Sequence, residues 1–221
     1  MLRALDELLG TPERDVSGDP VGEIVGTILS QNTTAANSGT AYEALRKAMP
    51  TWSDVRDAER ALLIDTIRPA GLADTKAATI QRVLQGLPTR EGGPSLDALN
   101  DMSDEAATAH LVAFNGVGVK TAACVLVFAL GRDICPVDTH VHRVANRLGL
   151  VDTKNRDKTY AALQSVIPAG QSYAAHVLLV RFGRATCKAR GPLCHECPVF
   201  DDCRFEERHD YAARAAGRGV A

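Results

Sequence analysis

The sequence predicts an all-α protein. Apolar residues recur at spacings of three and four in several segments, which is the periodicity of one buried helix face. Residues that start and stop helices border these segments, and no segment shows the strong alternation of a half-buried strand. A chain of 221 residues with 45% apolar and 24% charged residues is long enough for one good-sized core or two small ones.

The helices expected in the first half are defined by caps and breakers. The segment 21–30 has one apolar face and follows Asp19 and Pro20, which supply an N-cap and a proline at the first helical position. The remaining boundaries expected here are a helix over 41–49, caps at Ser53 and Asp74, and a helix over 75–87.

The helices of the first part are followed by the clearest loop of the chain, residues 88–94, which is rich in glycine, proline and charge. Ser103 then opens a helix that ends at Ala113, with acidic residues in its first turn. The other elements expected here are helices over 120–130, from Asp138 or Thr139 to Leu148, and over 173–186, and a frayed tail after Tyr211.

The net charge and the N-terminal sequence limit the function classes. The formal net charge is -2, so no global positive field indicates a nucleic-acid partner, and such binding would need a local patch. The N-terminus lacks the pattern of a signal peptide, and the longest apolar run, 122–130, is shorter than the roughly 20 residues that span a bilayer. We expect a cytoplasmic, soluble protein with no membrane partner.

Four of the six cysteines lie within a short stretch near the C-terminus. In a reducing compartment such clustering is typical of metal ligation rather than of disulfides. Tetrahedral zinc and an iron–sulfur cluster are both compatible with four thiolates, although zinc ribbons usually contain two CxxC pairs and this chain has one. The pattern is C-x6-C-x2-C-x5-C, formed by Cys187, Cys194, Cys197 and Cys203.

A glycine-rich turn precedes Lys120. Gly116 and Gly118 lie two residues apart between two predicted helices, where glycine permits positive φ and lets a phosphate approach the backbone. Amides at the start of the next helix would donate to such an anion, although the turn also suits a plain helix connector. A lysine amine is a nucleophile only when neutral, and both the helix N-terminus and partial burial would disfavour the charged form of Lys120. A solvated surface lysine is the ordinary alternative.

Asp138 is a second candidate for chemistry. An aspartate before a helix is among the commonest N-caps, and Thr139 could serve as the cap instead. As a functional group, the carboxylate could stabilise developing positive charge or help to remove a proton from the lysine amine.

These motifs resemble one family in the same order along the chain. The segments NGVGVKTA, from Asn115, and VDTHVHRVANRLGL, from Val137, resemble the helix-hairpin-helix and the catalytic loop of the endonuclease III family. The cysteine spacing is that of the [4Fe-4S] loop in the endonuclease III and adenine-mismatch glycosylase families. The resemblance covers about residues 20–205, and Asn115 departs from the proline usual in that hairpin.

The resemblance implies two lobes with a DNA-binding cleft between them. Residues 20–134 would form a six-helix bundle that contains the helix-hairpin-helix. Residues 1–19 and 135–221 would form an iron–sulfur cluster domain, with a [4Fe-4S] cluster on the four cysteines.

The activity implied by the resemblance is that of a bifunctional DNA glycosylase and AP lyase of base excision repair, which removes oxidised pyrimidines. Lys120 would attack the sugar C1′ and displace the base, and the resulting imine would allow β-elimination of the strand. Asp138 would be the partner carboxylate. The substrate would be double-stranded DNA with damaged bases or abasic sites, bound by a monomer associated with the nucleoid.

The resemblance also implies DNA contacts. Gln31 and Asn32 would plug the gap left by an extruded nucleotide, and Leu72 would act as an apolar wedge. Ala35 stands where bacterial relatives often have an aspartate. The other expected contacts are the turn residues Gly116, Gly118 and Val119 and the basic residues Arg184, Lys188 and Arg190.

Two other functions compete with this interpretation. A monofunctional mismatch glycosylase of the same superfamily would lack a lysine at the position of Lys120, and adenine-specific forms usually carry a further C-terminal domain. A non-catalytic DNA-binding module would use its metal centre for structure alone or for redox sensing. The presence of Lys120 favours the lyase.

Overall fold

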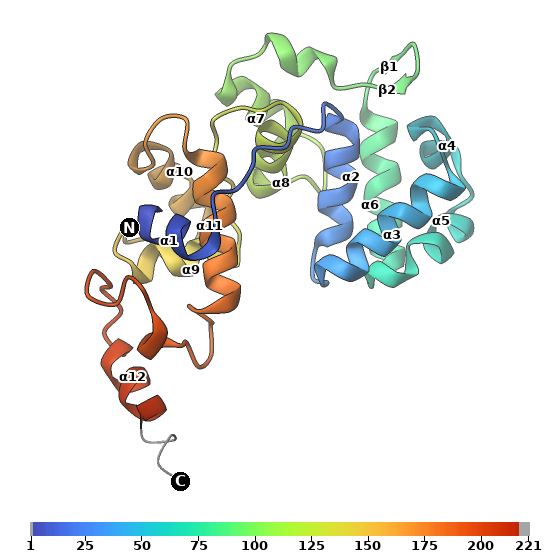
Figure 1. Ribbon diagram of the computed structural model, residues 1–221. Coiled ribbons are helices and arrows are strands. Elements are labelled where there is room, and N and C mark those ends of the chain that lie inside the picture. The colour runs from blue at the N-terminus through green and yellow to red at the C-terminus, as the bar shows by residue number, and fades with distance from the viewer. Residues whose placement is uncertain (1, 217–221) are drawn as a thin grey trace. The chain divides into compact units, whose positions relative to one another are not determined.

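The computed structural model describes residues 2–216 and is helical almost throughout (Figure 1). Twelve α-helices and one two-stranded sheet make up the regular structure of this part of the chain, apart from short 3-10 and π-helical turns. The predicted all-α class is therefore confirmed. None of the helices described is both long enough and apolar enough to cross a membrane.

The chain divides into two compact units. We call residues Val16–Arg132 the bundle unit, and Met1–Asp15 together with Asp133–Ala221 the C-terminal unit. The boundaries fall four residues and two residues before those expected from the sequence. The backbone amides of Ser17 and Gly18 donate to the carbonyls of Phe128 and Ala129 at 2.9 and 3.2 Å, which fixes this segment to the bundle unit.

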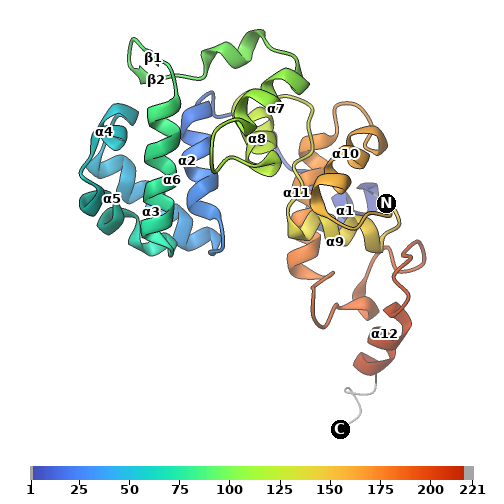
Figure 2. The ribbon, with the colours of Figure 1, turned by 180° about the vertical axis from the view of Figure 1, so that it is seen from behind.

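The bundle unit is built around α2 (Pro20–Ser30). Asp19 caps this helix by accepting from the Gly22 amide at 2.8 Å, as the sequence predicts. Helix α2 packs on α3, α6 and α8, and Figures 1 and 2 show it between these neighbours. The elements that follow α2 are α3 (Ala35–Ala48), α4 (Trp52–Asp57), α5 (Arg60–Ile67), η1 (Arg68–Ala70), α6 (Ala73–Gly86), β1 (Thr89–Arg90), β2 (Gly93–Pro94), η2 (Asp97–Asp101), α7 (Asp104–Val112), α8 (Val119–Cys124) and the π-helical turn η3 (Val125–Ala129).

The C-terminal unit is built around α11 (Ser172–Ala185), which packs against α1 (Leu2–Leu9) and α9 (Thr139–Arg147). Phe182 of α11 is fully buried in the core that these helices share. The other elements of this unit are α10 (Arg156–Val166), η4 (Cys194–Glu196) and α12 (Arg208–Ala216).

Several boundaries differ from the prediction for identifiable reasons. Thr51, not Ser53, caps α4, because Thr51 and Asp54 form a capping box with bonds of 2.8 and 3.0 Å. The N-cap of α6 is Leu72, without a side-chain bond, so Asp74 lies in the first turn rather than at the cap. Inside the predicted loop, β1 and β2 pair antiparallel around glycines with positive φ.

Two helical segments also differ in extent. The helix expected over 120–130 changes after Cys124 into η3, and the two carbonyls bonded by Ser17 and Gly18 belong to this turn. Helix α12 continues past Tyr211 to Ala216, so the expected frayed tail is wrong for this stretch. Residues 217–221 of that tail lie outside the described residues.

Candidate active site

The glycine turn between α7 and α8 is tight. The Val117 amide donates to the Phe114 carbonyl at 2.9 Å, and Gly116 has a φ of 103°. A Cβ at Gly116 would lie 2.4 Å from the Thr79 Cγ2 atom of α6. The fold therefore requires glycine at position 116 for two reasons, the positive φ of the backbone and the lack of space for a side chain.

Gly118 differs from Gly116, because the fold does not require a glycine there. Its φ of -92° suits any residue, and a Cβ at this position would meet no atom within 4 Å. Gly118 is the N-cap of α8, and no side chain caps the helix. The first amides of α8 therefore lie behind a position without a side chain, an arrangement that lets an anion reach them.

Lys120 lies in the first turn of α8 and is half-buried. Within the described part of the chain its amine makes no hydrogen bond and no ion pair. The side chain acts electrostatically on Glu23 of α2, a helix that packs against α8. No hydrogen bond therefore holds the amine, which leaves it available to attack a substrate.

Glu23 is a functional candidate that the sequence did not reveal. Burial raises the pKa of Glu23 from its ordinary value of 4.5 to about 7, although the Thr27 hydroxyl and the charge of Lys120 oppose this rise. Thr27 donates to Glu23 Oε1 at 3.2 Å. In the sequence, Glu23 is recognisable only as the single charged residue of the largely apolar helix α2. Its proximity to Lys120 depends on how α2 and α8 pack.

Two further acidic groups adjoin Glu23. A Cβ at Gly22 would lie 2.2 Å from Asp19 Oδ2 and 2.8 Å from Tyr42 Oη, so these two groups converge above the start of α2. Burial raises the pKa of Tyr42, and the charges of Asp19 and Glu23 act in the same direction. The neighbourhood of Lys120 in the bundle unit is therefore acidic.

Asp138 is the N-cap of α9 in the C-terminal unit. Its Oδ1 atom accepts from the amides of His140 and Val141, both at 2.8 Å, so the alternative in which Thr139 caps this helix is wrong. No hydrogen bond in the described part of the chain uses Oδ2. One carboxylate can therefore cap the helix through one oxygen and leave the other for chemistry. Lys120 and Asp138 thus belong to different units.

The four cysteines predicted as ligands line one cavity, together with Arg147, Phe182 and Phe205. All four thiols are free of disulfides. Burial raises the pKa of Cys194 and Cys197, and the negative charge of neighbouring thiolates acts in the same direction. A bound cationic centre would offset both effects, and four soft thiol donors fit a zinc ion or an iron–sulfur cluster. Among the residues described, no three or more side chains of His, Cys, Asp or Glu converge closely enough to hold a single metal ion as they stand.

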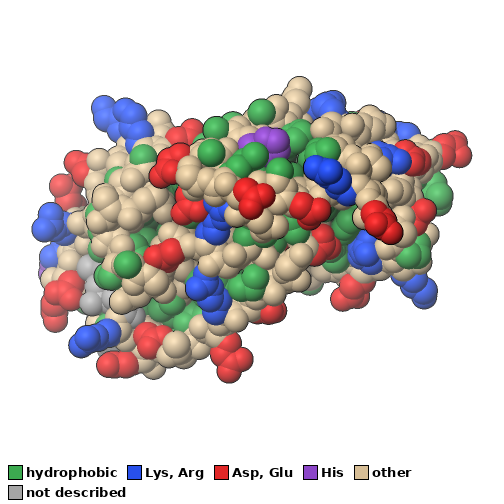
Figure 3. Space-filling model, turned by 90° about the horizontal axis from the view of Figure 1, so that it is seen from above, with side chains coloured by type: hydrophobic (Ala, Val, Ile, Leu, Met, Phe, Trp, Pro, Cys, Tyr) green, Lys and Arg blue, Asp and Glu red, His purple; other side chains and the backbone are tan. Residues whose placement is uncertain are grey.

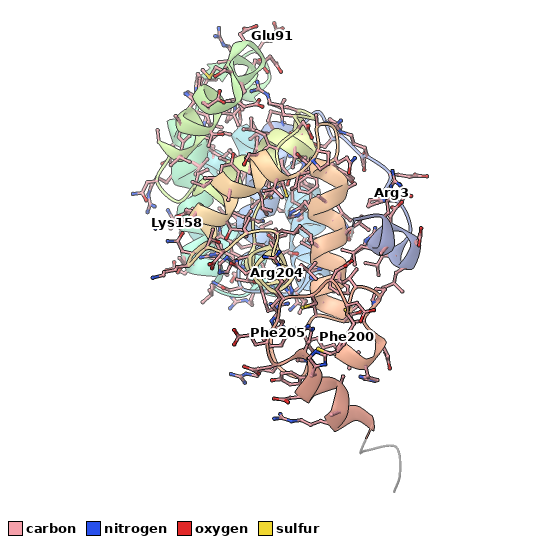
Figure 4. All side chains as sticks on the ribbon, turned by 90° about the vertical axis from the view of Figure 1, so that its left-hand side faces the viewer. Arg3, Glu91, Lys158, Phe200, Arg204 and Phe205 are labelled. Atoms are coloured by element: carbon pink, nitrogen blue, oxygen red, sulfur yellow. The ribbon has the colours of Figure 1, made fainter. Side chains whose placement is uncertain are left out.

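Arginines of α9 support this cavity, a role that was not predicted from the sequence. Arg147 Nη1 lies 3.6 Å from Cys187 Sγ and donates to the Lys188 carbonyl at 2.8 Å. Arg143 donates to the Cys187 carbonyl at 3.0 Å. Their spacing of four residues, on one helix face, was the available sign. The guanidinium of Arg147 also stacks over Phe205, at 4.1 Å, which Figure 4 labels with Phe200 and Arg204 on the segment before α12.

The predicted basic contacts are exposed. Arg184 lies in the last turn of α11, and Lys188 and Arg190 follow it. Acidic and basic side chains are interspersed over the face in Figure 3, which agrees with the absence of a global positive field.

The predicted DNA-probing turns share an unusual backbone conformation. Asn32, after α2, has a φ of 52°, and Leu72, before α6, has a φ of 50°. They are the only non-glycine residues with positive φ in the described part of the chain. Leu72 is 61% exposed, and Gln31 and Asn32 are exposed as well. Strained backbone of this kind concentrates at functional positions.

Comparison with known proteins identifies the family. The family model described as "HhH-GPD superfamily base excision DNA repair protein" matches residues 25–169, which is more than half of the chain. The chain belongs to the HhH-GPD superfamily. The predicted resemblance to endonuclease III is thereby confirmed, and the chain is an enzyme of the base excision repair DNA glycosylase class.

Individual HhH-GPD relatives are similar over most of their length. The endonuclease III of Thermotoga maritima is 33% identical over 197 residues, which cover 89% of this chain and 88% of the relative. That of Sulfolobus acidocaldarius is 31% identical, over 82% and 80%. An Arabidopsis thaliana protein is 40% identical over 75% of this chain, which spans 57% of that relative's length.

Solved HhH-GPD structures confirm the fold. The structure of a non-covalent endonuclease III–DNA complex matches with a TM-score of 0.79 at 26% identity, over 98% of this chain and 95% of that one. A trapped endonuclease III–DNA covalent intermediate matches with a TM-score of 0.76 at 27% identity, over 95% of each chain.

Proposed function

We propose that this enzyme is a bifunctional DNA glycosylase and AP lyase that removes oxidised pyrimidines from duplex DNA and cleaves the abasic strand. The observation that carries the proposal is the half-buried residue Lys120, which follows the glycine turn and, within the described part of the chain, makes neither a hydrogen bond nor an ion pair. A structural relative at 27% identity is described as a trapped covalent intermediate with DNA, which supports a covalent step.

In the proposed reaction, the amine of Lys120 attacks C1′ of the damaged nucleotide. The bond between C1′ and the base breaks, and the base leaves with the electron pair and is protonated. The free oxygen of Asp138 stabilises the positive charge that develops on the sugar, and its carboxylate takes up the proton released by the amine.

The C1′–O4′ bond then breaks, its electron pair goes to O4′, which is protonated, and a covalent imine forms between C1′ and Lys120. This imine permits strand cleavage. Its positive charge acidifies the C2′ proton, and loss of that proton drives departure of the 3′ phosphate oxygen with the C3′–O electron pair. Water hydrolyses the imine and releases Lys120. Each step conserves electrons without an external oxidant or reductant.

We propose that Cys187, Cys194, Cys197 and Cys203 hold a [4Fe-4S] cluster. The four free thiols that share one cavity support this, and so does the arginine beside Cys187. The cluster would fix the loop 187–203, which contains few apolar residues to order it. Iron and acid-labile sulfide analysis of purified protein tests this, and zinc in their place would contradict it.

The proposal extends to DNA contacts, which the exposure and the backbone conformation of the DNA-probing turns support. Backbone amides at Gly116, Gly118 and Val119 bind a phosphate, and Gln31, Asn32 and Leu72 occupy the space left by the extruded nucleotide. Exposed Arg184, Lys188 and Arg190 contact the backbone of the duplex. The enzyme would act as a monomer in the cytoplasm, at the nucleoid.

Borohydride trapping on abasic duplex DNA tests the proposal. We expect a covalent adduct with the wild type and none with Lys120→Gln, which should retain DNA binding. Lys158→Gln is a matched control, because Lys158 is an exposed lysine of α10 (Figure 4). Base removal without any adduct would instead indicate a monofunctional glycosylase, and neither activity would indicate a binding module. Duplexes with thymine glycol, uracil and 8-oxoguanine mismatches would define the lesion range.

A further inference from the structure

Lys76 is a buried lysine that the proposed chemistry does not use. It lies on α6, is only 3% exposed, and occupies the apolar face of that helix one turn before Ile80. Its Nζ atom donates to the carbonyl of Leu29 at 2.8 Å and to the carbonyl of Ala70 at 2.8 Å. Burial lowers the pKa of this ammonium group. A charge in this position costs free energy, so the contacts that it makes are informative.

The two carbonyls lie at equivalent places in the fold. Leu29 is in the last turn of α2, and Ala70 is the last residue of η1, so neither carbonyl has a partner within its own helix. Each is followed within three residues by a position with left-handed backbone, Asn32 or Leu72. One ammonium group therefore holds the starts of both probing turns, which are far apart in sequence.

A shared donor of this kind couples the two turns. Displacement of either carbonyl would weaken its bond to Lys76 and would leave part of a buried charge unsatisfied, which is strongly unfavourable. Lys76 therefore links the carbonyl that precedes the turn of Asn32 to the carbonyl that precedes the turn of Leu72. If two side chains must insert into one DNA duplex at the same time, the distance between them has to be fixed.

We infer that Lys76 is a positioning residue that holds the turns of Asn32 and Leu72 at one spacing, so that both enter a duplex with an extruded nucleotide together. This inference rests on the proposed function. Loss of Lys76 should weaken recognition of the gap in the duplex and spare the reaction at a nucleotide that needs no extrusion.

The test compares Lys76→Met with Gln81→Met. Gln81 lies on the same helix, is also buried, and donates to the Ala58 carbonyl at 2.8 Å, away from both turns. Both variants lose buried hydrogen bonds and should lose thermal stability. The ratio of binding affinities for a duplex with a tetrahydrofuran abasic analogue and for intact duplex should fall by about tenfold or more in Lys76→Met. In Gln81→Met this ratio should not change. Lys76→Met should also abolish the fluorescence change of 2-aminopurine beside the analogue. Equal preference in both variants would overturn the inference.

Two further measurements keep the outcome decisive. If Lys76→Met does not fold, binding of the same duplex by Asn32→Gly, Leu72→Gly and the double variant replaces it, since glycine keeps the positive φ. If the turns are coupled, the fold-loss of binding affinity in the double variant should be at least about threefold smaller than the product of the two single fold-losses. A fold-loss equal to that product contradicts coupling. Borohydride trapping on single-stranded abasic DNA separates the two proposals. If the wild type forms no covalent adduct with this DNA, the proposed function is contradicted. If the adduct forms but Lys76→Met keeps the wild-type preference for the abasic duplex, only the role of Lys76 is contradicted.

Discussion

Glu23→Gln should change how the stability of this protein depends on pH. The pKa of Glu23 rises from 4.5 to about 7, chiefly because the carboxyl group is buried. Between these two values the folded chain binds this proton and the unfolded chain does not. The contribution of Glu23 to stability is therefore fully present below pH 4.5, decreases as the pH rises, and is lost above about pH 7.

The expected magnitude follows from the same values. Each unit of pKa difference between the folded and unfolded chain corresponds to about 1.4 kcal/mol, so ionisation of Glu23 should reduce the free energy of unfolding by roughly 3 kcal/mol across this range. Glutamine keeps the shape and does not ionise. Between pH 5 and pH 8, the free energy of unfolding of Glu23→Gln should therefore rise by roughly 2 to 3 kcal/mol relative to that of the wild type.

Urea unfolding followed by circular dichroism at several pH values measures this difference. Other titrating groups contribute equally to both proteins, so the difference between the two curves isolates Glu23. In a Lys120→Gln background the transition should move to higher pH, because the positive charge of Lys120 lowers the pKa of Glu23. Wild-type and Glu23→Gln curves that stay parallel from pH 5 to pH 8 would refute the reasoning.

Four other substitutions have separable outcomes. Gly118→Ala should change the free energy of unfolding by less than about 1 kcal/mol yet weaken DNA binding. Gly116→Ala should lower the free energy of unfolding by well over 1 kcal/mol, because of its φ of 103° and the contact with Thr79. Thermal melts and DNA-binding titrations distinguish the two variants, and unimpaired DNA binding by Gly118→Ala would contradict the proposed phosphate site. Asp138→Asn should keep the cap of α9 and stability within about 0.5 kcal/mol but slow base removal by about 100-fold or more, so wild-type rates would exclude its catalytic role. Cys197→Ser should lose bound iron and expose the loop 187–203 to limited proteolysis, and full iron content would exclude Cys197 as a ligand.

The sequence predicted most where structure is local. The periodicity of apolar residues located α2 and α6, because burial of one helix face imposes that pattern directly. Asp19 was recognised as a cap for the same reason, since its bond spans only three residues. The family resemblance located Lys120 and the cysteines, but not their surroundings.

The remaining features depend on contacts between distant segments. The proximity of Glu23 to Lys120 and the bonds of Lys76 arise from helix packing, which no local pattern encodes. The π-helical turn η3 is held partly by amides from residues before α2. The capping box of α4 is a local signal, because Thr51, unlike the predicted cap Ser53, has an acidic residue three positions later.

The two units differ in how their parts are spread along the chain, which has a consequence for biosynthesis. Residues 16–132 leave the ribosome as an uninterrupted stretch and can assemble while translation continues. Helix α1 (Leu2–Leu9) is made before its partner α11 (Ser172–Ala185), so at about 5 to 20 residues per second α1 waits roughly 8 to 33 seconds for α11. During that interval Leu5, which is fully buried in the folded protein, is exposed to solvent, because the core that covers it is formed by residues made later.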